Sequence, residues 1–195
     1  MSRMFKIAIF ASGAGTNAAK IIEFFSSSPD ISVDFVVSNR EKAGVLNVAK
    51  DNSIDSMFFS RTQLLNKSDK ILDILDSRNI DFIVLAGFLL KLPEILVSTF
   101  EGRILNIHPS LLPDFGGKGM YGDNVHHAVL NAGKKVTGIT IHQVNNEYDR
   151  GKVIFRKQVN VAENETVESL KRKIQILEHK YFPEVIQSEI YKLIK

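Results

Sequence analysis

The stretch that decides the fold is FKIAIFASGAGTN, residues 5–17. Its first six residues, Phe5–Phe10, are apolar apart from Lys6, which predicts a buried strand. The glycine-containing turn Ser12–Asn17 then leads into a helical stretch near Thr16–Phe25. A strand, a glycine turn and a helix in this order are typical of a βαβ unit, in which the next strand runs parallel to the first.

The alternation of strands and helices continues along the chain to residue 108. We expect four more strands and three more helices before that point. The strands are Val33–Ser38, Asp55–Phe59, Phe82–Leu85 and Ile104–Ile107, and the helices lie near Gly44–Asn52, Ser68–Arg78 and Pro93–Phe100. Because the strands are almost entirely apolar, both faces of the sheet should be covered by helices.

The pattern changes after residue 108. The segment Pro113–Asn124 holds four glycines, too many for regular structure, and a helix is expected at Val125–Ala132. The runs Val136–Val144 and Val153–Val161 predict an antiparallel hairpin. A closing helix should start near Thr166 and be broken or kinked at Pro183. The fold class is therefore α/β: a Rossmann-like three-layer sandwich of one domain, residues 1–195, mainly parallel with a hairpin near its C-terminal end and a closing C-terminal helix.

Composition limits the function. The chain has 195 residues, of which 44% are hydrophobic, a formal net charge of +3 and no cysteine. Without cysteine it has no disulfide, no thiolate nucleophile and no cysteine-bound metal, which fits a reducing cytoplasm. The basic residues are scattered among acidic ones, so we expect no nucleic-acid partner. We also expect no signal peptide, no membrane span and no metal, because none of the histidines has metal-ligand spacing.

The strongest functional signal is the segment NIHPSLLP that follows Leu105, with its two polar residues Asn106 and His108. Side chains alternate faces along a strand, so these two residues share one face, and Pro109 should end the strand. A neutral hydrogen-bonding group beside a titratable one, at the carboxyl end of a strand, suits a reaction that develops charge on oxygen. The alternative is a polar pair that is merely satisfied at a strand end.

The turn Ser12–Asn17 predicts an anion site. Its glycines let backbone N–H groups approach a phosphate, and the helix N-terminus adds positive charge. The turn also fits the loose dinucleotide pattern G-x-G-x-x-[GA]. That pattern expects an acid after the second strand, where this chain has Ser38-Asn39-Arg40, so NAD is disfavoured, although Arg40 suits a 2′-phosphate. A phosphate site is favoured, and the alternative is a tight turn without ligand.

Two other segments are open to two interpretations. Asp149, in the hairpin turn, is either a partner for His108 or an ordinary solvated turn residue. The apolar run Phe88–Leu92 is either core packing or one wall of a pocket for a flat heterocycle. The other four histidines, His126, His127, His142 and His179, are interpreted as structural.

Taken together, these motifs resemble the phosphoribosylglycinamide formyltransferase family of folate-dependent enzymes over essentially the whole chain. The run Asn106-Ile107-His108-Pro109-Ser110-Leu111-Leu112-Pro113 is typical of the wider formyltransferase superfamily. The turn Ser-Gly-x-Gly-Thr-Asn indicates the glycinamide ribonucleotide branch. The remaining similarities are Val84–Phe88, Asp149 followed by Gly151, and Glu178-His179 with Pro183.

The resemblance implies a set of roles. Asn106, His108 and Asp149 would be catalytic, while Gly15, Thr16, Asn17 and Glu178 would bind the ribonucleotide. Leu89, Leu90, Lys91, Leu92, Asn106 and Asn145 would hold 10-formyltetrahydrofolate, the formyl-donating cosubstrate. The partners would be these small molecules alone, with the protein a monomer or homodimer. This chain departs from the family pattern in Asn145-Asn146-Glu147-Tyr148 and in Lys152, and it shows no clear basic residue for a folate tail near Gln63-Leu64-Leu65.

The implied reaction is formyl transfer to the amine of 5-phosphoribosylglycinamide. Asp149 would raise the pKa of His108 and so favour its charged form. The alternatives are hydrolysis of 10-formyltetrahydrofolate, an NADP-dependent reductase and a binding module without turnover. Transfer to initiator methionyl-tRNA is a further alternative. That reaction would need an added C-terminal RNA-binding domain beyond residue 195.

Overall fold

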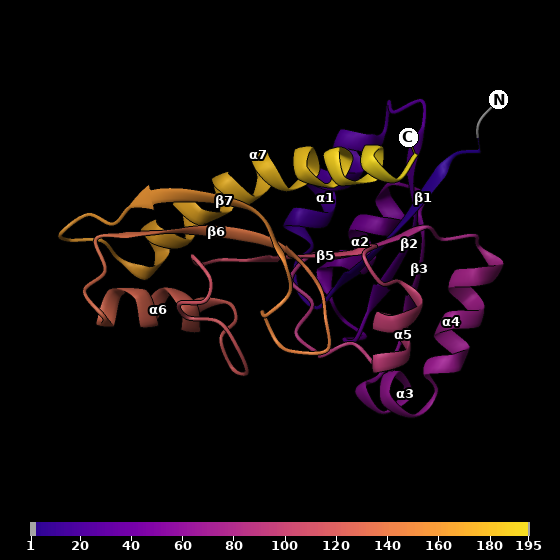
Figure 1. The fold of residues 1–195 in the computed structure, drawn as a ribbon, viewed down its shortest axis with the longest axis horizontal. Coiled ribbons are helices and arrows are strands. Elements are labelled where there is room, and N and C mark those ends of the chain that lie inside the picture. Colours follow the sequence, from indigo (N-terminus) through magenta and orange to yellow (C-terminus); the bar gives the residue numbers. More distant parts are fainter. Residues whose placement is uncertain (1–2, 195) are drawn as a thin grey trace. The chain divides into compact units, whose positions relative to one another are not determined.

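The computed structural model describes residues 3–194. The chain divides into two compact units, Met1–Leu105 and Asn106–Lys195, and Figure 1 labels their elements. Hydrogen-bonded neighbours among the strands follow the order β3-β2-β1-β4-β5-β6-β7. The strand β5 (Ile104–His108) contains the boundary between the two units.

The first unit is the alternating α/β region that the sequence predicts. Its strands are β1 (Phe5–Ala11), β2 (Ile31–Ser38), β3 (Asp55–Phe58) and β4 (Phe82–Leu85). The pairs β1–β2, β1–β4 and β2–β3 are all parallel. All four residues of β4 and the last five of β1 are buried, which confirms that both faces of these strands are covered.

The helices of this unit begin and end close to the predicted residues. They are α1 (Thr16–Phe25), α2 (Gly44–Asp51), α4 (Ser68–Ser77) and α5 (Glu94–Thr99). The additional helix α3 (Arg61–Asn66) was not predicted. It begins with a capping box, in which the Ser60 hydroxyl accepts from the Gln63 N–H at 3.2 Å and the Gln63 side chain accepts from the Ser60 N–H at 2.8 Å. The Ser-x-x-Gln spacing was the sequence signal for this helix.

The second unit contains the hairpin and the long closing helix. Its elements are α6 (Asp123–Asn131), β6 (Val136–Gln143), β7 (Val153–Asn160) and α7 (Val167–Ile194). The strands β6 and β7 pair antiparallel, as predicted. The helix α7, yellow in Figure 1, packs against both strands and contacts α6.

The proline in α7 does not end the helix. Pro183 is buried inside α7, which continues to Ile194, so the expected break is wrong. Proline removes one N–H donor from a helix, but burial of the neighbouring apolar residues Phe182 and Ile186 on the same helix compensates for the lost hydrogen bond. The start is as predicted: the Thr166 hydroxyl caps the helix by accepting from the Ser169 N–H at 3.1 Å.

Candidate active site

The carboxyl end of β5 presents the two polar residues that the sequence singles out. The strand ends at His108, directly before Pro109, as predicted. Asn106 is half-buried and His108 is only 4% exposed. A histidine this deeply buried needs partners for both ring nitrogens, and the second unit supplies them from two other segments.

The first partner comes from the segment that follows β5. The Nε2 atom of His108 lies 2.8 Å from the backbone oxygen of Phe115. The segment is held in place by Thr140 on β6, whose hydroxyl accepts from the Leu112 N–H at 3.0 Å and donates to the Ser110 oxygen at 2.7 Å. The fully buried Thr140 thus fixes the backbone that carries Phe115.

The second partner is Asp149, in the turn between β6 and β7. Its Oδ2 atom lies 3.6 Å from Nδ1 of His108 and accepts a hydrogen bond from the Gly117 N–H at 2.8 Å. Asp149 is therefore not an ordinary solvated turn residue. The structure brings together the three residues expected to be catalytic.

A fourth residue completes the cluster, and the sequence interpretation missed it. His142, read as structural, lies with its Nε2 atom 3.1 Å from Nδ2 of Asn106 and 3.6 Å from Oδ1 of Asp149. Its place in the apolar run of β6, between Ile141 and Gln143, gave no sign of this. The only available signal was that an isolated histidine in a buried strand requires polar partners. We refer to Asn106, His108, His142 and Asp149 as the polar cluster.

Of the four described non-glycine residues with left-handed backbone, two are the residues that hold His108. Phe115 has a φ of 54° and Asp149 a φ of 53°, both in the left-handed region. Such conformations cost about 1–3 kcal/mol each in non-glycine residues and persist where the surrounding contacts impose them. Phe115 and Asp149 each place an acceptor against the same imidazole.

Electrostatics in the cluster differ from the sequence-based expectation. Burial lowers the pKa of His108 below 6.5 and outweighs the opposing effects of Asp149 and the Phe115 oxygen. Asp149 acts to raise this pKa, as expected, but the cost of placing a charge in a buried site exceeds its attraction, so the expected preference for the charged form is wrong in the free protein. Burial acts to raise the pKa of Asp149, but its contact with His142, the hydrogen bond from the Gly117 N–H and the charge of His108 lower it overall, so this carboxylate is ionised at neutral pH.

The predicted anion site in the first unit is a tight strand-to-helix turn. Gly15 has a φ of 84°, and a Cβ at this position would lie 2.7 Å from the Cα of Val45. Only glycine fits there. Gly15 precedes Thr16 and Asn17, which form the first turn of α1, so backbone N–H groups are directed as anion binding requires.

The segment expected to hold the folate begins at the end of β4. Leu89 and Leu90 are half-buried and Lys91 is exposed, whereas Leu92 is 4% exposed and belongs to the core. The N–H of Leu89 donates to the hydroxyl of the buried Ser12 at 2.9 Å. This hydrogen bond ties the segment to the beginning of the glycine turn within the first unit.

The other two predicted binding residues lie in the second unit. Glu178 is half-buried on α7, and Asn145 is exposed in the hairpin turn. The Asn145 side chain accepts from the Glu147 N–H at 3.0 Å, which shapes the turn ahead of Asp149.

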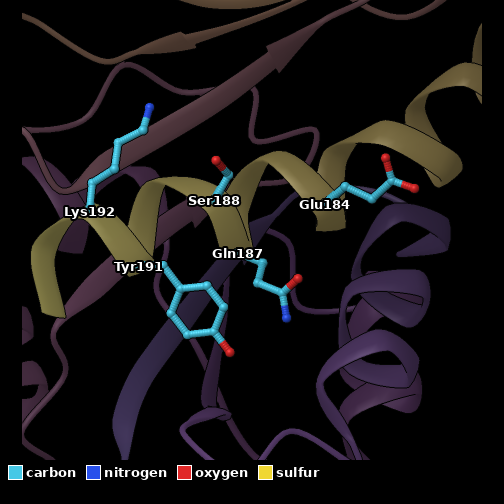
Figure 2. Close-up of a pocket in the computed structure, with 5 residues that line it drawn as sticks. All are labelled: Glu184, Gln187, Ser188, Tyr191 and Lys192. Atoms are coloured by element: carbon cyan, nitrogen blue, oxygen red, sulfur yellow. The ribbon is translucent and has the colours of Figure 1, made fainter. Parts of the chain in front are cut away.

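A separate pocket lies along the C-terminal half of α7 and shares no residue with the polar cluster. It has a volume of about 440 Å³ and is drawn in Figure 2. Its lining residues are Glu184, Gln187, Ser188, Tyr191 and Lys192. All five are exposed or half-buried. Within residues 3–194, no helix has the length and apolar character that crossing a bilayer requires, and no group of three metal-binding side chains gathers.

Comparison with known proteins shows the family of this chain. The family model described as "Formyl transferase" matches residues 5–186. The chain belongs to the formyl transferase family. The match includes β5, the hairpin turn with Asp149, and the glycine turn, so all the predicted site residues fall inside it.

Individual relatives lie in one branch of this family. The chain is 41% identical to a chloroplastic phosphoribosylglycinamide formyltransferase of Arabidopsis thaliana, over 97% of this chain and 67% of the relative. It is 35% identical to the phosphoribosylglycinamide formyltransferase of Bacillus subtilis, over 94% of both chains. The crystal structure of the enzyme of that name from Anaplasma phagocytophilum superposes with a TM-score of 0.86 at 32% identity, covering 95% of this chain and 86% of that one.

Proposed function

We propose that this protein transfers the formyl group of 10-formyltetrahydrofolate to the amine of 5-phosphoribosylglycinamide, a step of purine biosynthesis. The observation that carries the proposal is the polar cluster, in which Asn106, His108 and an ionised Asp149 meet at the end of β5. The curated relatives over most of the chain bear the name of this activity. Because the family match spans both units, we treat residues 1–195 as one functional domain.

The attacking amine needs little activation. An α-amino group with a pKa near 8 is about one tenth neutral at pH 7, a cost of about 1 kcal/mol. The protein therefore needs no nucleophile of its own, in agreement with the absence of cysteine from the sequence. Aligning the two bound substrates contributes about 7–11 kcal/mol.

The main chemical task is to stabilise the oxyanion that forms when the amine adds to the formyl carbon. We assign the direct hydrogen bond to Nδ2 of Asn106, and one such donor is worth about 2.7–4 kcal/mol of barrier. His108 would supply positive charge. Both of its ring nitrogens face acceptors, the Phe115 oxygen and Asp149, and only the doubly protonated ring donates to both.

The lowered pKa of His108 fits this role. In the free protein, burial opposes the imidazolium. A negative charge forming beside the ring would favour it, so protonation of His108 would accompany oxyanion formation. Asp149, whose own pKa is lowered, is a weak base. It would hold the imidazolium and orient a water that carries the proton from the attacking nitrogen towards the leaving folate nitrogen.

The binding roles follow the two units. In the first, Gly15, Thr16 and Asn17 would bind the ribonucleotide phosphate at the start of α1, and Leu89–Leu92 would line the folate site. In the second, Glu178 would contact the ribonucleotide, and Asn145 with Asn106 would contact the folate. We further propose a cytoplasmic monomer or homodimer that needs no metal and binds neither nucleic acid nor membrane. The absence of cysteine from the sequence suits that compartment.

The test uses the purified protein with 10-formyl-5,8-dideazafolate and glycinamide ribonucleotide, with the deformylated product followed by absorbance. We expect turnover that requires the ribonucleotide and is lost in His108→Ala. Turnover without the ribonucleotide would replace the proposal with folate hydrolysis. Absence of turnover under both conditions would reject it, and binding of NADPH in the same preparation would then favour the reductase.

A further inference from the structure

His142 is a buried titratable residue that the proposed mechanism does not use. It lies near the end of β6 and is 2% exposed. Both of its ring nitrogens have partners: Nδ1 lies 2.8 Å from the backbone oxygen of Gln143, and Nε2 lies 3.1 Å from Nδ2 of Asn106. The ring therefore connects the backbone of β6 to the amide of Asn106.

The first of these contacts sets the tautomer of the ring. A carbonyl oxygen only accepts hydrogen bonds, so Nδ1 of His142 carries a hydrogen. The carbonyl itself cannot move away. The Gln143 N–H donates to the Lys152 oxygen at 2.9 Å, and a Cβ on Gly151 would approach the Gln143 oxygen to 1.6 Å, which shows how closely the segment before β7 packs against the end of β6.

The tautomer in turn sets the orientation of the Asn106 amide. With the hydrogen on Nδ1, Nε2 of the neutral ring is an acceptor, so it binds one N–H of the Asn106 NH₂ group. The other N–H has only a long contact, 3.5 Å, to Oδ1 of Asp149. This second hydrogen is held loosely enough for a substrate oxygen to take it.

The opposite orientation of the amide is unfavourable. Rotating the amide by 180° would place Oδ1 of Asn106 against the lone pair of Nε2 and near the Asp149 carboxylate. Three acceptors would then face one another in a site shielded from water, where electrostatic repulsion is strong. The NH₂ group would point away from both Nε2 and the carboxylate.

We propose that His142 is a positioning residue: as the Nδ1–H tautomer it fixes the Asn106 amide with its NH₂ group directed at the reacting formyl oxygen. This inference rests on the proposed function, because the formyl oxygen is the acceptor that it assigns to Asn106. His142 does not touch the substrate. It acts by making one amide orientation the only one available when the substrate binds.

The tautomer is tested first, on the wild-type protein. With ¹⁵N-labelled histidine, long-range ¹H–¹⁵N correlation at pH 7.5 distinguishes a protonated Nδ1 from a protonated Nε2. We expect His142 to carry its hydrogen on Nδ1, and His142→Gln identifies its signals. A hydrogen on Nε2 would overturn the inference whatever the enzymatic activity.

The link to Asn106 is tested by a double-mutant cycle. We measure kcat and KM for wild type, His142→Leu, Asn106→Ala and the double variant. We expect His142→Leu to lower kcat on the order of 10- to 100-fold, less than the 10²–10³-fold of losing the donor itself. KM for both substrates should stay within about twofold, because the oriented donor acts in the transition state. In the Asn106→Ala background, His142→Leu should have almost no further effect.

Two further variants separate positioning from stability. His142→Gln keeps an acceptor on the side chain and should recover part of the lost kcat. His126→Gln removes another buried histidine, 4% exposed and on α6, and is the matched control. It should change Tm without a comparable loss of kcat. Equal kcat losses in His142→Leu and His126→Gln, or losses that multiply independently in the double variant, would overturn the inference. If the wild type shows no ribonucleotide-dependent turnover, the proposed function fails, and the NMR result still decides the tautomer.

Discussion

The polar cluster and the glycine turn are both candidate functional features, but they are built in opposite ways. The glycine turn is six consecutive residues, Ser12–Asn17, and its shape is set by the backbone at Gly15. The polar cluster is assembled from side chains 36 and 43 residues apart in the sequence, which β5 and β6 with the following turn bring together. A site of backbone groups is lost by adding a single atom, whereas a site of side chains is lost by removing one.

The largest effect is expected from Asp149→Asn. The amide keeps the shape of the carboxyl group but removes the charge that holds a protonated His108. We expect kcat to fall about 10²- to 10³-fold, with KM for the ribonucleotide nearly unchanged. Steady-state kinetics measure both quantities.

The matched control is Asp114→Asn. This carboxylate lies in the same unit but is 54% exposed and pairs with Lys134 at the surface. Such pairs are worth about 0–1 kcal/mol, so kcat should hardly change. Equal losses in the two variants would show that the cluster responds to net charge and not to contact with His108.

The glycine turn is tested by Gly15→Ala against Gly13→Ala. At Gly15 the added methyl group would meet Val45, and the φ of 84° is unfavourable for alanine. We expect a loss of stability above about 1 kcal/mol and at least about a tenfold rise in KM for the ribonucleotide. At Gly13 nothing lies within 4 Å of the added Cβ. That variant should stay within about 0.5 kcal/mol of wild type in urea unfolding. If both variants bind the ribonucleotide normally, the turn is structural only.

A smaller effect on the cluster is expected from Thr140→Val. The substitution keeps the shape but leaves the Leu112 N–H and the Ser110 oxygen without their shared hydroxyl. Each unsatisfied group costs about 1–3 kcal/mol. We expect a lower Tm and a kcat reduced by about tenfold or less, because the Phe115 oxygen shifts relative to His108. Thr140→Ser retains the hydroxyl and should keep both close to wild type; a loss of kcat as large as that of Thr140→Val would contradict this account.

The smallest expected effect is a pH dependence of the free energy of unfolding, which should arise from the unit that holds the polar cluster and not from the unit that holds the glycine turn. All five histidines lie in the second unit, and burial lowers the pKa of His108 and of His126 below 6.5. As the pH falls below 6.5, the unfolded chain binds protons on these residues before the folded chain does, so the free energy of unfolding decreases. The lowered pKa of Asp149 acts only near and below 3.8, outside this window.

Urea unfolding at pH 7.5 and 5.5 measures this decrease. His126→Gln should make it smaller, whereas substituting the exposed His127 with glutamine should leave it unchanged. An identical pH dependence in wild type and His126→Gln would show that other groups are responsible.

The same contrast explains what the sequence could reveal. The spacing of apolar residues predicted the α/β architecture and most of the residues at which strands and helices begin and end. Buried parallel strands are recognisable because they are apolar throughout. The glycine turn is contiguous and was recognisable as a unit. The missed helix α3 required attention to Ser60 and Gln63, a signal that was present.

The cluster was harder to predict. Asn106 and His108 were evident as polar residues at the end of an apolar strand. The part played by His142 depends on which atoms face it across β6, and the direction of the His108 pKa depends on how deeply the ring is buried. Neither quantity follows from residue type or spacing, since both arise only when distant segments pack together.

The left-handed backbone at Phe115 also bears on how this protein would change under selection. Glycine adopts that conformation without strain, and a chain chosen only for heat resistance would gain by exchanging Phe115 for it. The carbonyl that holds His108 would then sit on a more mobile residue. Heat resistance and turnover would therefore change in opposite directions on this one exchange.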